Sequence, residues 1–98
     1  MATVTQKSGS VLRAVRFEFR APAYAQRVAV AGDFNSWNLY KNLMQKNPSG
    51  IWEATVNLAP GRYQYKIVIN DKEWLTDPKA QAQIPNRYGS TNSVLEVK

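Results

Sequence analysis

Alternation of apolar and polar residues over short segments is the feature that most constrains the fold of this chain. In residues 14–20, AVRFEFR, the apolar Val15, Phe17 and Phe19 occupy every second position. A period of two residues places such side chains on one face of an extended segment and is typical of a β-strand with one buried face. The sequence therefore predicts an all-β protein. The expected strands include residues 14–20, 28–32, 43–44, 51–58, 62–70 and 93–98.

Turn-forming residues separate these segments. Pro22, Pro48 and Pro60 stand at breaks between predicted strands, and residues 76–92 form a long stretch that we expect to be irregular. The sequence contains no amphipathic helix with capping residues. About seven short strands joined by turns favour an antiparallel β-sandwich. The length of 98 residues allows one domain. We expect a flexible segment at residues 1–9 and a β-sandwich domain at residues 10–98.

The composition argues against several classes of function. The chain has no Cys and no His, which removes disulfides, thiolate zinc sites and the commonest general base. No apolar run approaches the roughly 20 residues of a membrane span, so no membrane partner is expected. Residues 1–10 lack the apolar core of a signal peptide, which predicts a cytoplasmic protein. The net charge of +6 comes from scattered basic residues rather than from one basic tract.

The acidic residues do not suggest catalysis. A glycosidase needs two carboxylates at a set separation, but Asp33, Asp71 and Asp77 stand in turn contexts, where they shape or solvate the loop. Ser90 and Thr91 have no His to activate them. The sequence therefore predicts a non-enzyme with no catalytic residues, no metal site and no cofactor.

The three tryptophans occupy different contexts. Trp52 lies in phase with the apolar positions of residues 51–58 and is expected in the core. Trp37 and Trp74 each follow a polar turn, so strand alternation sends neither one inward. Either could instead fold back as a lid over the core, a role for which Phe34 is the better candidate. Exposed tryptophans in surface loops suit a ligand with flat apolar faces, such as a sugar or a nucleobase.

Polar residues that suit sugar hydroxyls accompany the tryptophans. In residues 62–70 the alternation places Lys66 outward, and residues 88–92, YGSTN, form a loop rich in hydroxyl and amide groups. Asp33 and Asn35 are expected to shape the turn before Trp37. The alternation directs one set of side chains inward, namely Tyr63, Tyr65, Ile67 and Ile69, and another outward, namely Gln64, Lys66 and Val68.

Three motifs in order resemble carbohydrate-binding module family 48. They are VAVAGDFNSWN, GIWEATVNLAPGRYQYKIVINDKEWLTDP and NRYGSTNSVLEVK, and together they cover roughly residues 14–98. The family includes the glycogen-binding domain of the AMP-activated protein kinase β subunit and the N-terminal domains of isoamylases and glycogen branching enzymes. The resemblance implies an immunoglobulin-like β-sandwich that binds α-1,4-linked glucan such as glycogen, starch or maltooligosaccharide.

The resemblance also implies a set of carbohydrate-binding residues. Trp37 and Trp74 match the two stacking platforms, Lys66 matches a lysine that bonds sugar hydroxyls, and Asn92 matches the asparagine of the final loop. Ser90 stands where the family has a hydroxyl residue. Tyr88 replaces a leucine that inserts into the curve of the glucan in the kinase subunit, which leaves open the selection among linear, cyclic and branched chains.

Two other functions stay open at this point. The same sandwich could serve as an interaction or structural domain that packs on an attached or associated glucan enzyme or kinase subunit. Basic residues such as Arg16 and Arg20, together with stacking aromatics, could also bind single-stranded nucleic acid. This is the least favoured of the three functions. Nucleic-acid binding would weaken strongly with salt, whereas sugar stacking would not.

Overall fold

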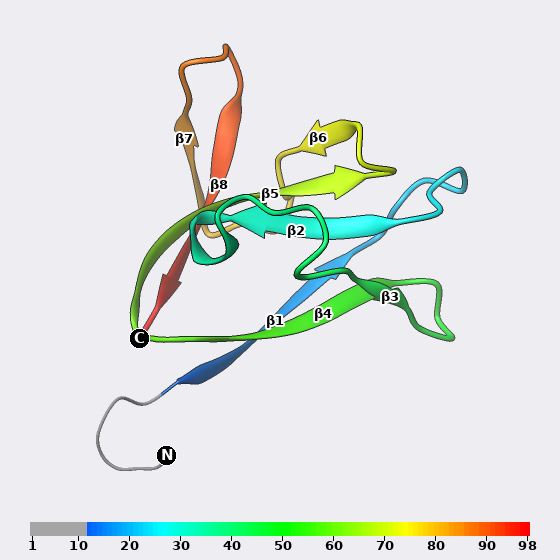
Figure 1. Cartoon of the computed structure of the whole chain (residues 1–98), viewed down its shortest axis with the longest axis horizontal. Helices are drawn as coiled ribbons and strands as arrows, with labels where there is room; N and C mark the ends of the chain where they lie inside the picture. Colours follow the sequence, from blue (N-terminus) through cyan, green and yellow to red (C-terminus); the bar gives the residue numbers. More distant parts are fainter. Residues whose placement is uncertain (1–11) are drawn as a thin grey trace.

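The computed structural model describes residues 12–98, which form eight strands and one short 3-10 helix (Figure 1). Residues 1–9, expected to be flexible, lie outside the described residues. Within the described part, no helix is long and apolar enough to cross a membrane. The elements are β1 (Arg13–Phe19), β2 (Val28–Gly32), η1 (Asp33–Asn35), β3 (Gln45–Lys46), β4 (Trp52–Leu58), β5 (Gly61–Ile69), β6 (Glu73–Leu75), β7 (Ala82–Pro85) and β8 (Thr91–Val97).

The strands form two antiparallel sheets, which confirms the predicted all-β class. One sheet has the order β1-β4-β3, and the other has the order β2-β5-β8-β7, with β6 paired to β5. Strand β5 is the longest and pairs with β2, β6 and β8. In Figure 1 the hairpin formed by β7 and β8 extends away from the other strands. Side chains of both sheets contribute to one core, so the architecture is a β-sandwich.

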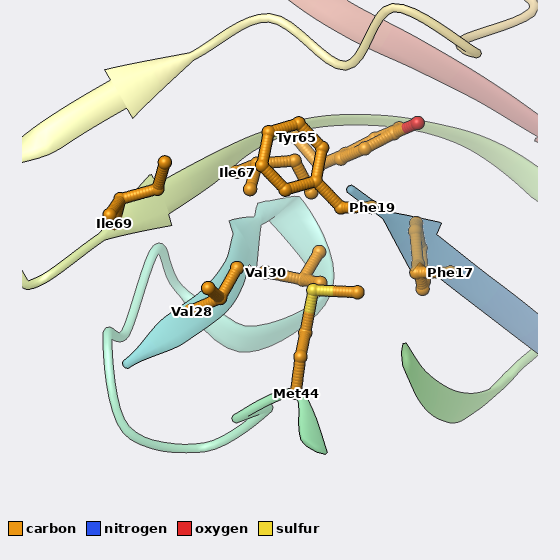
Figure 2. Close-up of a cluster of buried hydrophobic side chains, with 8 residues drawn as sticks. All are labelled: Phe17, Phe19, Val28, Val30, Met44, Tyr65, Ile67 and Ile69. Carbon is orange, nitrogen blue, oxygen red and sulfur yellow. The ribbon is translucent and has the colours of Figure 1, made fainter. Parts of the chain in front are cut away.

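The smaller sheet follows the predicted alternation. Phe17 and Phe19 of β1 are buried while Arg16 is exposed, because successive side chains of a strand point to opposite faces. On β4, Leu58 is buried and Trp52 packs against the core cluster, as expected for both. Figure 2 shows the buried cluster between the sheets, formed by Phe17, Phe19, Val28, Val30, Met44, Tyr65, Ile67 and Ile69.

The larger sheet departs from a simple inward and outward division. Tyr65, Ile67 and Ile69 of β5 are buried in the core, as predicted. Val68, predicted outward, is only 1% exposed. It lies directly opposite Trp74 of β6 in the antiparallel register. Directly opposite residues share one face of a sheet, so the prediction had the correct face for Val68 but was wrong about its exposure.

Two strand predictions need correction. A short strand was expected at residues 43–44, but β3 begins at Gln45, and Leu43 makes only an isolated bridge to Ala29. Residues 76–92 were expected to be irregular, yet β7 lies within them and pairs with β8, which itself starts at Thr91. The four residues of β7 are all exposed, so the alternation of Ala82, Gln83 and Ile84 corresponds to no buried face, and the prediction did not recognise a strand there.

A buried tyrosine and a buried carboxylate join the larger sheet to the loop that follows β6. The hydroxyl of Tyr65 donates a hydrogen bond to Oδ2 of Asp77 at 2.6 Å, and Asp77 is 4% exposed. The backbone N–H of Asp77 donates to the Ser93 hydroxyl. Burial, followed by the bond to the carboxylate, raises the pKa of Tyr65 far above its ordinary value of 10. Asp77 is therefore structural, as the sequence indicated.

Candidate functional site

One surface pocket of about 850 Å³ lies beside the larger sheet. Its volume falls within the range of about 300–1,000 Å³ typical of small-molecule sites. All six residues that the sequence proposed for carbohydrate binding line it, together with two that it did not propose. The lining residues are Trp37, Lys66, Trp74, Asn86, Arg87, Tyr88, Ser90 and Asn92. The structure thus brings the six residues together, and their part in binding stays a prediction.

Strand register explains why residues far apart in sequence meet at this pocket. Trp74 on β6 lies opposite Val68 of β5, and Lys66 is two residues from Val68 on the same strand. Side chains two residues apart on a strand share a face. Lys66 and Trp74 therefore project from the face of the larger sheet opposite the core. Trp74 is 41% exposed, as its turn context predicted.

Trp37 reaches the pocket through a tight reversal after β2. Ser36 and Trp37 both have left-handed backbones, with φ of 57° and 58°, which is uncommon for residues other than Gly. The N–H of Trp37 donates to the carbonyl of Gly32 at 2.9 Å. Trp37 is partly buried rather than fully exposed. The strained turn fixes where its indole stands.

Gly32 and Asn35 hold that reversal in place. A Cβ atom at Gly32 would lie 2.6 Å from the carbonyl oxygen of Gln64, so only glycine fits there. Asn35 is 6% exposed, accepts from the N–H of Gly32 and donates to the carbonyl of Val30. This confirms that Asn35 shapes the turn. Asp33 does so over a longer range, because its carboxylate accepts from the N–H of Gln64 on β5.

Lys66 is a buried cation whose polar partners in the described part of the chain are neutral oxygens. Its side chain was expected to be outward, and the residue is 7% exposed because the start of β8 covers it. The ammonium Nζ donates to the hydroxyl of Ser90 at 3.0 Å and to the carbonyl oxygen of Thr91 at 2.8 Å. An ammonium has three N–H donors, so one donor remains beyond these two bonds.

Asn92 belongs to a short chain of side-chain amides. Its Nδ2 donates to Oε1 of Gln64 at 2.9 Å, and its Oδ1 accepts from Nδ2 of Asn86 at 3.1 Å. Each amide group keeps one further N–H or lone pair for another partner. These bonds orient the Asn92 amide beside the pocket before any ligand arrives, which reduces the entropy lost on binding.

Asn86, which the sequence analysis did not single out, organises the loop between β7 and β8. Its side-chain Oδ1 accepts from the backbone N–H groups of Tyr88 and Ser90, and its backbone N–H donates to the carbonyl of Ser90. Asparagine commonly bonds the backbone two residues further on. The spacing of Asn86 to Tyr88 and Ser90 is therefore the signal that could have identified it.

Arg87 was also missed. Its guanidinium lies over the ring of Tyr88, 5.5 Å from the centroid, at a distance typical of a cation–π contact. Tyr88 is 80% exposed. Nothing in the sequence separates Arg87 from the other basic residues, so only the pocket reveals it.

The two carboxylates that precede Trp74 most closely in the sequence are engaged with other residues outside the pocket lining. Asp71 pairs with Arg27, and this hydrogen bond raises the pKa of the guanidinium further. Glu73 accepts from the hydroxyl of Tyr24, which raises the pKa of that hydroxyl. No Asp or Glu is among the lining residues of the pocket. In residues 12–98 no group of three or more His, Cys, Asp or Glu is placed to hold a metal ion.

A family model described as the glycogen recognition site of AMP-activated protein kinase matches residues 14–98. The chain belongs to this family. The family is a group of non-catalytic carbohydrate-binding modules, and the match confirms the resemblance to carbohydrate-binding module family 48. The matched residues include every lining residue of the pocket.

Curated relatives of this glycogen-recognition module are much longer enzymes. It is 43% identical over 79 residues to the 1,4-alpha-glucan branching enzyme GlgB 2 of Xanthomonas campestris pv. campestris, covering 76% of this chain and 11% of the enzyme. The branching enzyme GlgB of Burkholderia cenocepacia is 42% identical over 83 residues, or 78% of this chain and 11% of the enzyme. GlgB 2 of Rhizobium johnstonii is 46% identical over 74 residues, or 69% of this chain and 10% of the enzyme. The chain thus spans about a tenth of these relatives.

Proposed function

We propose that this module binds a segment of α-1,4-linked glucan, such as glycogen, starch or maltooligosaccharide, without cleaving it. The observation that carries the proposal is that Trp37 and Trp74 line one pocket together with the hydrogen-bonding groups of Lys66, Ser90 and Asn92. Family membership and the branching-enzyme relatives support the same ligand class.

The two indoles provide surfaces for glucose rings. The C–H groups of a pyranose form an apolar face, and an indole offers an electron-rich face against which it can lie. Trp37 comes from the turn after β2 and Trp74 from β6, so the two platforms belong to separate elements. An α-1,4 chain curves, whereas a β-1,4 chain is flat and straight. Platforms tilted to one another would therefore favour the curved chain.

Polar groups around the indoles suit the sugar hydroxyls. The remaining donor of Lys66, the hydroxyl of Ser90 and the free positions of the Asn92 amide lie along the same pocket. Hydroxyls both donate and accept, and these groups offer both kinds of partner. Tyr88, exposed at the mouth of the hairpin loop, offers a third aromatic face that stacks on a ring or caps the end of the chain.

Affinity for one short glucan is expected to be modest. An open site leaves much of the ligand in water and orders a flexible chain. Retention on a polysaccharide then comes from repeated binding along the chain or from an attached glucan-active enzyme. The relatives, in which the matching region is a tenth of a branching enzyme, support an enzyme as the second component.

Calorimetric titration with maltoheptaose tests the proposal. We expect saturable binding to maltoheptaose and none to cellohexaose, which is β-1,4-linked. Trp37→Ala and Trp74→Ala should each weaken binding by about five- to a hundredfold, if stacking of a sugar ring contributes the roughly 1–3 kcal/mol known for a nucleobase. Tyr40→Ala removes an exposed aromatic outside the pocket and should leave the affinity unchanged. Unaltered maltoheptaose binding in the double tryptophan variant would refute the platforms, and no glucan binding would favour an interaction domain.

A further inference from the structure

The pocket carries two positive charges and no negative one. Lys66 and Arg87 line it, and its lining residues include no Asp or Glu. Lys66 is 7% exposed, and among residues 12–98 its ammonium donates only to the Ser90 hydroxyl and the Thr91 carbonyl. A buried cation without a carboxylate partner retains a large unmet electrostatic interaction. Neutral sugar hydroxyls would leave that charge uncompensated.

Arg87 is available to an incoming anion. Its guanidinium lies over the Tyr88 ring and makes no hydrogen bond or ion pair within residues 12–98. Its N–H groups can therefore donate to a ligand. Arg16 and Arg27 behave differently, because Arg16 pairs with Glu18 and Glu53, and Arg27 pairs with Asp71. Guanidinium edges match the oxygens of phosphate in a two-bond geometry.

We propose that the pocket prefers α-glucan that carries a phosphate monoester on a glucosyl hydroxyl, and that Arg87 is the residue that reads the phosphate. The inference rests on the proposed glucan binding. The indoles hold the glucose rings, and the phosphate of one ring lies between the guanidinium of Arg87 and the ammonium of Lys66. A phosphate monoester carries close to two negative charges at neutral pH, so its charge matches that of the two cations.

The stack of Arg87 on Tyr88 supports this role. Because the ring limits the positions of the guanidinium, less side-chain entropy is lost when the phosphate binds. Asn86 fixes the backbone on either side, with its Oδ1 bonded to the N–H groups of Tyr88 and Ser90. The cation is therefore presented on an ordered loop at the edge of the pocket.

The experiment compares maltoheptaose with maltoheptaose that carries one phosphate on O6, by calorimetry at pH 7.5. We expect the phosphorylated sugar to bind about three- to tenfold more tightly at 20 mM salt, the range of one charge-assisted contact that is partly exposed. The preference should shrink at 300 mM salt, where exposed charges are screened. Arg87→Gln should abolish the preference, measured as the ratio of the two affinities, and Arg87→Lys should retain part of it.

Arg62→Gln is the matched control. Arg62 is exposed on β5 outside the pocket lining, and its loss lowers the net charge by the same amount. The Arg62→Gln variant should keep the preference for the phosphorylated sugar. Equal affinity for the two sugars, or an equal loss of preference in both variants, would overturn the phosphate proposal while glucan binding stands. No binding of either sugar would instead refute the proposed function. A phosphorylated oligonucleotide that bound as tightly as the phosphorylated sugar would overturn the preference for glucan.

Discussion

The ammonium of Lys66 lies 2.8 Å from the carbonyl oxygen of Thr91. This bond joins the middle of β5 to the first residue of β8, and a second bond from the same ammonium reaches Ser90 in the preceding loop. The strand that runs through the centre of the larger sheet thus fixes one wall of the pocket. Lys66 acts on both the shape of the site and its charge.

Lys66→Met should therefore weaken binding much more than it weakens the fold. Methionine keeps the apolar stem, and the Thr91 carbonyl keeps a second donor in the Thr76 hydroxyl at 3.0 Å. Replacing a buried charge by an apolar residue of similar volume is often neutral for stability. We expect a loss of about tenfold or more in maltoheptaose affinity, since hydrogen bonds from charged groups contribute about 1.5–3 kcal/mol. The free energy of unfolding should change by less than about 1 kcal/mol.

Calorimetry and urea unfolding measure the two quantities. Lys41→Met, on an exposed lysine outside this pocket, serves as the control and should change neither. A variant at Lys66 that unfolded early but bound normally would contradict the assignment.

Asn86→Ala should loosen the hairpin loop without opening the core. The change removes the acceptor for the N–H groups of Tyr88 and Ser90 and the donor to Asn92. We expect faster hydrogen exchange at the amides of Tyr88 and Ser90 and about three- to tenfold weaker glucan binding, because the loop must then be ordered on binding. Asn57→Ala, at an exposed position of β4, is the control. Unchanged exchange in the loop would show that these bonds do not order it.

Gly32→Ala should destabilise the fold through a steric clash. The added Cβ would stand 2.6 Å from the Gln64 carbonyl oxygen and 2.7 Å from Cβ of Tyr65. Overpacking of this kind costs about 1–3 kcal/mol, and it would also shift the carbonyl that accepts from Trp37. Gly50→Ala meets no atom within 4 Å but has a positive φ, so about 1 kcal/mol is expected there. Urea unfolding compares the two, and a smaller effect at Gly32 than at Gly50 would contradict the clash.

Stability should fall at alkaline pH because of Tyr65. Its pKa is raised in the folded state, mainly by burial and then by the bond to Asp77. The unfolded tyrosine ionises near pH 10 while the folded one keeps its proton. The stabilisation is therefore complete below pH 10 and is lost as the pH rises above it, by up to about 1.4 kcal/mol per pH unit. Urea unfolding at pH 8, 10 and 11 should show a smaller decline in Tyr65→Phe, and parallel declines would contradict the assignment.

The strands were predictable where one face of a strand is buried and the other is not. Phe17 and Phe19 on β1 are an example. Apolar residues recur there at every second position, and every second side chain of a strand points to the same face. Strand β7 was missed although Ala82, Gln83 and Ile84 alternate, and none of its four residues is buried. Its position depends on pairing with β8, as in Ile84 opposite Asn92. Such pairing is a property of the whole fold that no local pattern contains.

The site was predictable only in part for the same reason. The polar turns before Trp37 and Trp74 are local signals, and both residues line the same pocket. The depth of Lys66 was not predictable, because its cover comes from Ser90 and Thr91, more than 20 residues along the chain. Arg87 has no distinguishing neighbour in the sequence. Its proposed role depends on the folded arrangement, in which Arg87 and Lys66 line the same pocket and no carboxylate does.

The hairpin loop between β7 and β8 carries Arg87 and Tyr88 away from the hydrophobic core. Both side chains are exposed, and Tyr88 is 80% exposed. Substitutions of Arg87 and Tyr88 therefore meet no steric resistance from the sandwich, whereas Gly89 between them and Ser90 has a positive φ of 79° that favours glycine. Evolution or design is free to redirect the module toward other saccharides through this tip, while the interior that determines folding remains untouched.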